Sequence, residues 1–147
     1  MTRGARLRWS ARPSGFLMEK HMPLIRISLS AGKSAVDRHA IAMNVYEALR
    51  ETFDVPEGDL FATVTEHKPE DFIYDRQFFD IARSDDFVVV QVTVSYGRTV
   101  DQKKALYRRI VERLSDKPGV RSEDVFINLV EVAKENWSFG LGIAQRA

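Results

Sequence analysis

The chain has 147 residues, of which 44% are hydrophobic and 29% charged, and it contains no cysteine. This composition predicts one folded domain that is large enough to bury a core. It excludes disulfides, thiolate metal sites and a cysteine nucleophile, and it fits a cytoplasmic protein. Because no apolar run approaches the roughly 20 residues of a membrane span, we expect no membrane partner.

The formal net charge of +1 is unevenly distributed along the chain. Residues 1–21 contain five basic residues and one acidic residue, which leaves the rest of the chain with a net charge of −3. Binding of nucleic acid requires a basic surface on the folded part of a protein. The charge distribution therefore argues against a nucleic-acid partner.

Residues 1–22 differ from the rest of the sequence. They are rich in arginine, lack periodicity and contain Pro13-Ser14-Gly15, a composition typical of a disordered segment. A mitochondrial-type presequence, a basic tail that binds a partner and a translation start assigned too early all remain open. We favour the last, because Met22 offers a second start directly before Pro23. The domain is then residues 23–147.

From Pro23 onward the first elements follow from periodicity. Residues 25–30 alternate between apolar and polar, which predicts a strand. Ser34 and Asp37 then resemble a capping box, so a helix is expected to begin there. Its expected apolar stripe consists of Val36, Ala40, Met43, Tyr46, Leu49 and Phe53. A turn at residues 54–59 leads to a second strand at 60–67.

The same order of elements returns in the second half. Residues 87–94 form a nearly continuous apolar run, which predicts a strand buried on both faces. Thr99 and Gln102 make a full capping box for a helix that runs to about Leu114. Pro118-Gly119 makes a turn, and residues 125–132 form the closing strand.

The two halves are copies of one unit. A shift of 65 positions superposes residues 23–67 on 88–132 without a gap, matching Gly32 with Gly97 and Asp59 with Asp124. This predicts an α+β fold made of a tandem βαβ repeat, with a four-stranded mixed sheet and both helices on one face. The uncovered face of so apolar a sheet predicts association into a closed ring.

Pro23 aligns with Val88 under the repeat, so it replaces an ordinary strand residue. A harmless strand start is one interpretation, since proline is tolerated there. Removal of Met22 would instead leave Pro23 with a secondary amine. An α-amino group has a pKa near 8, and burial beside an apolar wall and a cation lowers that pKa. The neutral amine is a candidate general base, whereas an amide nitrogen in a longer chain has no such basicity.

Four segments together resemble the tautomerase superfamily, and most closely its branch related to malonate semialdehyde decarboxylase. They are Pro23-Leu24-Ile25, the turn from Val55-Pro56 to Asp59, Ser95-Tyr96-Gly97-Arg98, and Trp137-Ser138-Phe139-Gly140. The resemblance covers nearly the whole of residues 23–145. It implies the fold shared by tautomerases and MIF-like proteins, a homotrimer, an N-terminal proline in each active site, and neither a cofactor nor a metal.

The resemblance also assigns roles to single residues. Pro23 matches the family's catalytic proline, and Asp59 matches an acid that handles water in the decarboxylase, although its repeat partner Asp124 favours a purely structural turn residue. Arg98 matches a substrate-binding arginine, which would grip a carboxylate with two hydrogen bonds. Tyr96 stands where the decarboxylase has a second arginine, which argues against decarboxylation.

Two further positions complete the candidate site. Lys33 matches a position that is basic in several members of the superfamily, with a plain surface lysine as the alternative. Phe139, next to Trp137, lies in a segment that the family uses as an apolar wall at a subunit interface, and a plug for the core is the alternative.

We therefore expect a tautomerase acting on a small 2-oxo or enol carboxylate, with Pro23 moving the proton and Arg98 binding the carboxylate. A hydratase or decarboxylase of a 3-oxo acid would use the same pocket with a protonated Pro23 and Asp59. A non-catalytic ligand-binding or assembly module is the alternative from another class, because fold does not fix function.

Overall fold

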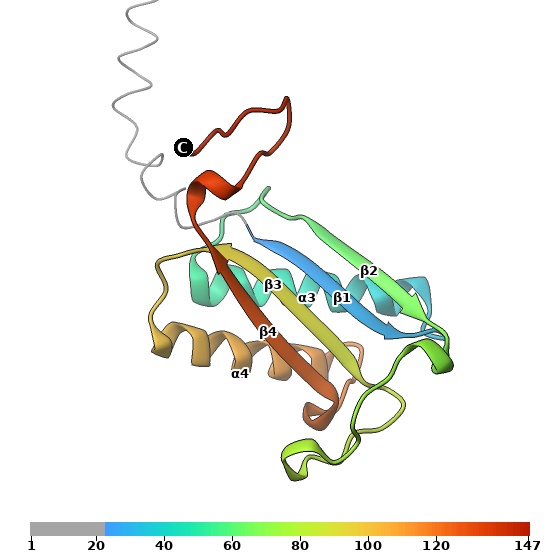
Figure 1. Ribbon diagram of the computed structural model, residues 1–147. Helices are drawn as coiled ribbons and strands as arrows, with labels where there is room; N and C mark the ends of the chain where they lie inside the picture. Colours follow the sequence, from blue (N-terminus) through green and yellow to red (C-terminus); the bar gives the residue numbers. More distant parts are fainter. Residues whose placement is uncertain (1–22) are drawn as a thin grey trace, which may run out of the picture.

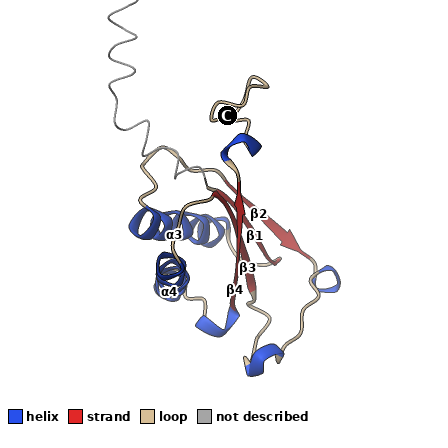
Figure 2. Cartoon of the chain, turned by 60° about the vertical axis from the view of Figure 1, so that its left-hand side comes forward, coloured by secondary structure: helices blue, strands red, loops and turns tan. Residues whose placement is uncertain are grey.

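The computed structural model describes residues 23–147, and the predicted extension at 1–22 lies outside the described residues. The strands and long helices are β1 (Leu24–Ser30), α3 (Ala35–Phe53), β2 (Ala62–His67), β3 (Val88–Ser95), α4 (Val100–Asp116) and β4 (Val125–Val132). The four strands form one mixed sheet in the order β2-β1-β3-β4. Both helices pack side by side on one face of it (Figures 1 and 2).

The predicted tandem repeat is confirmed by the pairing of the strands. β1 runs parallel to β2, and β3 runs parallel to β4. Ile25 pairs with Ala62, and the residues 65 positions later, Val90 and Ile127, pair in the same way. Since β1 and β3 are antiparallel, the start of each lies beside the end of the other. Pro23 therefore lies at the sheet end where β3 finishes, and Lys33 lies at the opposite end.

The core lies between the sheet and the two helices. β1 contributes Ile25, Ile27 and Leu29, and β3 contributes its alternate valines, all of them at most 1% exposed. The helices cover them with Leu49 and Leu106 among other residues. Burial of this apolar surface, at about 25 cal/mol per Å² removed from water, is the main favourable term that holds the layers together.

The helix starts were predicted correctly, and so was the later half of the stripe of the first helix, since Tyr46, Leu49 and Phe53 are buried. The Ser34 hydroxyl accepts from the backbone N–H of Asp37 at 3.1 Å, and Thr99 and Gln102 cap the second helix reciprocally. Val36, however, is 77% exposed. The buried stripe begins a turn and a half later, at Ile41, and Val36 points away from it because helical spacing does not bring the two onto one face.

The expectation that residues 87–94 are buried on both faces is not met within this chain. Burial along β3 alternates, and the open face carries polar side chains. Arg26 Nη2 donates to Gln91 Oε1 at 2.8 Å, and Gln91 Nε2 donates to Asn128 Oδ1 at 3.0 Å. A polar row thus crosses β1, β3 and β4, on a face that also carries the partly buried Val89 and the 42% exposed Phe126.

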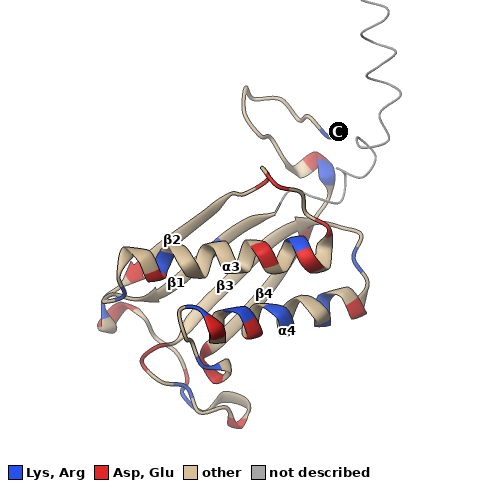
Figure 3. Ribbon diagram, turned by 180° about the vertical axis from the view of Figure 1, so that it is seen from behind, with Lys and Arg blue, Asp and Glu red and all other residues tan. Residues whose placement is uncertain are grey.

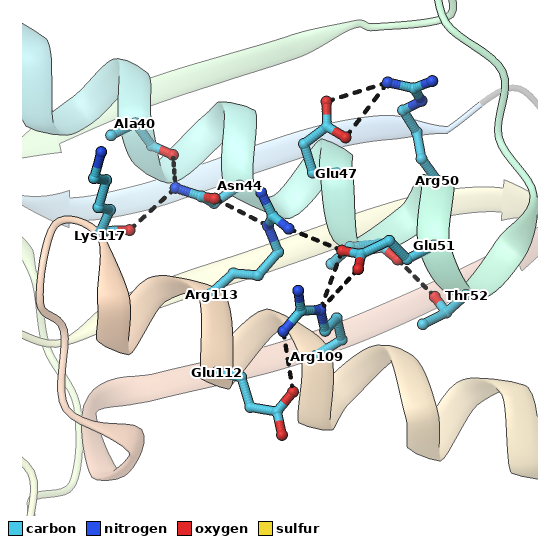
Figure 4. Close-up of polar contacts among 11 residues, drawn as sticks. Ala40, Asn44, Glu47, Arg50, Glu51, Thr52, Arg109, Glu112, Arg113 and Lys117 are labelled. Carbon is cyan, nitrogen blue, oxygen red and sulfur yellow. Dashed lines mark hydrogen bonds and ion pairs between the residues drawn. The ribbon is translucent and has the colours of Figure 1, made fainter.

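The outer side of the helix layer is held together by charged groups. Lysine, arginine and acidic residues are interspersed along both helices (Figure 3). Arg109 Nε donates to both carboxylate oxygens of Glu51 at 3.1 Å, and Arg113 donates to Glu51 at 2.9 Å and to Asn44 at 2.9 Å (Figure 4). The hydrogen bond from Arg109 is the main reason why the pKa of Glu51 lies below its usual value. This network joins α3 to α4.

Candidate active site

A pocket of about 200 Å³ opens at the end of the sheet where β1 begins. One wall comes from the start of β1 and from the segment before β2, and the other comes from the chain that follows β4. The lining residues are Pro23, Leu24, Asp59, Phe61, Trp137, Ser138 and Phe139. The pocket thus brings together three predicted site residues, which are Pro23, Asp59 and Phe139.

Pro23 is buried and directly precedes β1. The backbone N–H of Ile25 donates to the carbonyl of Phe61 at 2.9 Å, which aligns the beginning of β1 with the chain that leads into β2. This pairing places Pro23 and Asp59 on neighbouring chain segments. The first lining wall is therefore fixed by the sheet itself.

Asp59 is 9% exposed and is held by a residue of α3. Its backbone N–H donates to the hydroxyl of Tyr46 at 3.3 Å, and that hydroxyl donates to the carbonyl of Pro56 at 2.6 Å. A buried helical side chain thus sets the shape of the turn at residues 54–59. Asp59 thus lines the pocket from a fixed backbone.

The repeat partner of Asp59 has a structural role at the other end of the sheet. Asp124 is fully buried, and its carboxylate accepts from the N–H and the hydroxyl of Ser84 at 2.7 and 2.6 Å and from Arg121 at 3.1 Å. Burial alone raises the pKa of Asp124, but these hydrogen bonds outweigh burial and hold the pKa below its usual value. Asp124 therefore ties the segment before β3 to the start of β4.

The second wall is aromatic. The rings of Trp137 and Phe139 stack with centroids 5.8 Å apart and planes 23° from parallel. The indole Nε1 of Trp137 donates to the hydroxyl of Ser95 at 3.0 Å. The end of β3 thereby carries the segment that closes this side of the pocket.

Arg98 does not line the pocket in this chain. It lies at the same end of the sheet as Pro23, but it is 7% exposed and its guanidinium donates to the carbonyls of Ser95 at 3.1 Å and Phe53 at 3.4 Å. The guanidinium also stacks over the Phe53 ring at 4.8 Å. Burial lowers the pKa of Arg98 below its usual value. Its positive charge sits at the carboxyl end of α3, where the helix dipole favours a cation.

The structure places the other two predicted binding residues outside the pocket. Tyr96 is 64% exposed, and its backbone N–H donates to the carbonyl of Val132 at 3.1 Å. Lys33 lies at the opposite end of the sheet and forms an ion pair with Asp86 at 2.5 Å. There it lines a smaller cavity of about 160 Å³.

Leu24 and Phe61 are pocket residues that sequence reasoning missed. A signal existed, because Phe61 follows Asp59 by two positions, and alternate residues of an extended segment point to the same side. Among the described residues, no group of three or more His, Asp or Glu is arranged to hold a metal ion. No helix in the described part of the chain is long and apolar enough to cross a membrane.

Comparison with known proteins decides the family. The sequence model of the family described as "Tautomerase enzyme" matches residues 59–140. The chain is also 38% identical over 124 residues to the probable tautomerase YusQ of Bacillus subtilis, which covers 84% of this chain and 98% of that protein. The chain belongs to the tautomerase family. The predicted resemblance to this family is thereby confirmed.

Solved structures support the same assignment. A malonate semialdehyde decarboxylase (FG41) inhibited by 3-bromopropiolate is 39% identical, with a TM-score of 0.77 over 83% of this tautomerase-family chain and 92% of that chain. A second malonate semialdehyde decarboxylase, with decarboxylase and hydratase activities, is 28% identical with a TM-score of 0.77, covering 83% and 94%. A fused 4-OT symmetric trimer at 21% identity shares the fold, with a TM-score of 0.69 over 84% and 97%.

Proposed function

We propose that this chain is a cofactor-independent tautomerase of a small 2-oxo or enol carboxylate, and that Pro23 is its general base. The observation that carries the proposal is the position of Pro23, which lines a pocket between an apolar aromatic wall and the Asp59 segment. An apolar wall favours the neutral amine over the ammonium form. The neutral amine takes a proton from the enol oxygen or from the carbon and returns it to the other atom.

The base is available when the working protein begins at Pro23. Coverage of YusQ supports this proposal, since 98% of that relative is matched by 124 residues of this chain. The match leaves about 23 residues of this chain outside it, a length close to that of residues 1–22. We therefore interpret residues 1–22 as an extension that the active form lacks, and residues 23–147 as the enzyme.

Binding of the carboxylate is assigned to Arg98. Its guanidinium lies at the correct end of the sheet, but it reaches substrate only after exchanging the Phe53 carbonyl, at 3.4 Å, for a substrate oxygen. Tyr96 and Phe139 would then flank the substrate at the same end. Lys33 lies at the other end, so it contributes to a Pro23 pocket only from a neighbouring copy.

A homotrimer supplies such a neighbouring copy. The likeness in fold to a fused 4-OT symmetric trimer supports this state. The polar row of Arg26, Gln91 and Asn128 on the open face gives a second copy hydrogen-bonding groups to pair with. We propose that this trimer works in the cytoplasm without metal or cofactor.

A hydratase or decarboxylase of a 3-oxo acid is the second candidate. The presence of Asp59 in the Pro23 pocket favours it, as does the 39% identity to a malonate semialdehyde decarboxylase. In that reaction a protonated Pro23 stabilises negative charge on the substrate and Asp59 orients the attacking water. A non-catalytic binding module remains as the outcome in which neither reaction is found.

The test compares two forms of the protein, one beginning at Met1 and one at Met22, after intact-mass measurement of each. We expect the second to have lost Met22 and to ketonise phenylenolpyruvate, and the first to be inactive unless it is processed. Full activity of a form whose mass includes Met1 or Thr2 would exclude Pro23 as the base. Malonate semialdehyde, assayed with the same samples, tests the second candidate.

A further inference from the structure

Ser95 lies at the junction between the sheet and the segment that closes the pocket. It is the last residue of β3 and is 4% exposed. Its backbone is fixed on both sides, because it pairs with Val132 of β4 and its carbonyl accepts from Arg98 at 3.1 Å. Its hydroxyl is therefore presented from a rigid element.

The segment after β4 is an extended loop that rises beyond the ends of the strands (Figure 1). It closes on itself, since Phe139 N–H donates to Gln145 at 3.0 Å and Gln145 donates to the carbonyl of Gly140 at 3.0 Å. Several of its apolar side chains face solvent, with Leu141 92% and Ile143 53% exposed. These contacts give the loop an internal shape, but they do not fix its position over the pocket.

The hydrogen bond from the Trp137 indole to the Ser95 hydroxyl, at 3.0 Å, fixes that position. Trp137 in turn stacks on Phe139, and both residues line the same pocket as Pro23. We infer that Ser95 is a positioning residue, which holds the aromatic wall of the pocket through Trp137 and so sets the affinity for substrate. Ser95 does not touch the reacting atoms, so the chemistry at Pro23 does not depend on it. The part of this inference that concerns the affinity for substrate rests on the proposed function.

The repeat offers a matched control. Ser30 occupies the equivalent position at the end of β1 and lines the small cavity near Lys33, at the other end of the sheet. Ser30→Ala removes the same hydroxyl group as Ser95→Ala, from the equivalent position at the end of a strand. A general effect of losing a strand-end serine would appear in both variants, whereas an effect on the Trp137 wall would appear at Ser95 alone.

The first measurement needs no substrate. The sequence contains two tryptophans, Trp9 and Trp137, so the full chain carrying Trp9→Phe reports on Trp137 by its fluorescence. We expect Ser95→Ala to shift Trp137 emission to the red and to increase quenching by acrylamide about twofold, as the indole loses its buried partner. Ser95→Thr, which keeps the hydroxyl, and Ser30→Ala should leave both properties unchanged. Unchanged quenching in Ser95→Ala would overturn the inference.

The second measurement uses the active form and phenylenolpyruvate. We expect Ser95→Ala to raise KM about five- to tenfold with kcat within twofold, as for the loss of one hydrogen bond. Trp137→Phe should do the same, and the double variant should be no worse than either single one. Equal losses in kcat and KM, or additive losses, would overturn the inference. If no form turns over, the proposed function fails while the fluorescence result still decides the positioning role.

Discussion

The hydroxyl of Tyr46 joins the two ends of the turn that presents Asp59, donating to Pro56 at 2.6 Å and accepting from Asp59 at 3.3 Å. Tyr46 is 3% exposed and belongs to α3. A helix that covers one face of the sheet thus shapes one wall of the candidate active site. Loss of the hydroxyl should affect both the fold and the site.

Tyr46→Phe is expected to lower the free energy of unfolding by about 1–3 kcal/mol, because a buried N–H and a carbonyl lose their partner. It should also lower kcat/KM, by roughly tenfold, since Asp59 is no longer held in one position. Urea unfolding and steady-state kinetics measure the two effects. Tyr74→Phe is the control, because Tyr74 bonds the Ser84 carbonyl at 2.6 Å at the other end of the sheet. It should destabilise without changing kinetics, and a kinetic loss equal in both variants would contradict the prediction.

The architecture follows from local patterns, which is why the sequence was sufficient for it. Alternating residues, two capped helix starts and a gap-free repeat determine which segments are strands and helices. The shared register, seen in Ile25 with Ala62 and Val90 with Ile127, then follows from the equal length of the two units. The alternation in β3 was also present in Gln91 and Thr93, which lie two positions apart, but the surrounding valines obscured it.

The candidate site was predicted less completely, because side-chain direction depends on tertiary contacts. The motif placed Arg98 near Pro23, yet the Phe53 ring and carbonyl that hold its guanidinium come from the other unit of the repeat. Lys33 follows the end of β1 whereas Pro23 precedes its start, so the length of β1 itself puts Lys33 at the far end of the sheet. The contact between Arg98 and Phe53 has no signature in the sequence around Arg98, whereas the position of Lys33 follows from the predicted strand between it and Pro23.

Asp59 and Asp124 occupy the same position in the two repeats and allow a direct test of role. Asp59→Asn should lower kcat by about 100-fold if the carboxylate handles a proton or water. Asp124→Asn should lower the free energy of unfolding by about 2–4 kcal/mol, because it disrupts charged hydrogen bonds to Ser84 and Arg121, while kcat stays near that of the parent. Kinetics and urea unfolding of both variants measure this difference. A kinetic loss confined to Asp124→Asn would show that the two roles are reversed.

Asp124 should also make stability depend on pH. Its hydrogen bonds hold its pKa in the folded state below the usual value of 3.8. The stabilisation is therefore complete above that value and is lost as the pH falls through the lower pKa of the folded state. The stability difference between the parent and Asp124→Asn should be constant from about pH 5 to 8 and should shrink below about pH 4. A difference that persists at pH 2 would point to packing rather than charge.

The network around Glu51 should contribute modestly to the association of the two helices. Its side chain is 41% exposed, so solvent screening limits the expected loss in Glu51→Gln to about 0.5–1 kcal/mol, decreasing further in 1 M salt. Thermal unfolding at low and high salt measures the loss of stability and its dependence on salt. Glu47→Gln is the control, because Glu47 pairs with Arg50 within α3 at 3.4 Å. A larger loss in the control would show that α3–α4 pairing is unimportant.

The pH dependence of turnover separates the two proposed reactions, since they require opposite charge states of Pro23. A tautomerase that uses the neutral amine should lose kcat/KM tenfold per pH unit below the pKa of that amine. A hydratase or decarboxylase that uses the protonated amine should instead lose kcat/KM as the pH rises through the same pKa. Profiles are measured on the form that begins at Pro23, with phenylenolpyruvate and malonate semialdehyde as substrates. Asp59→Asn separates the titration of Asp59 from that of Pro23. A fall in kcat/KM that is due to Asp59 should vanish from the pH profile of this variant, while the fall due to Pro23 remains. A profile that is flat from pH 5 to 9 with both substrates would contradict any role for Pro23 in proton transfer.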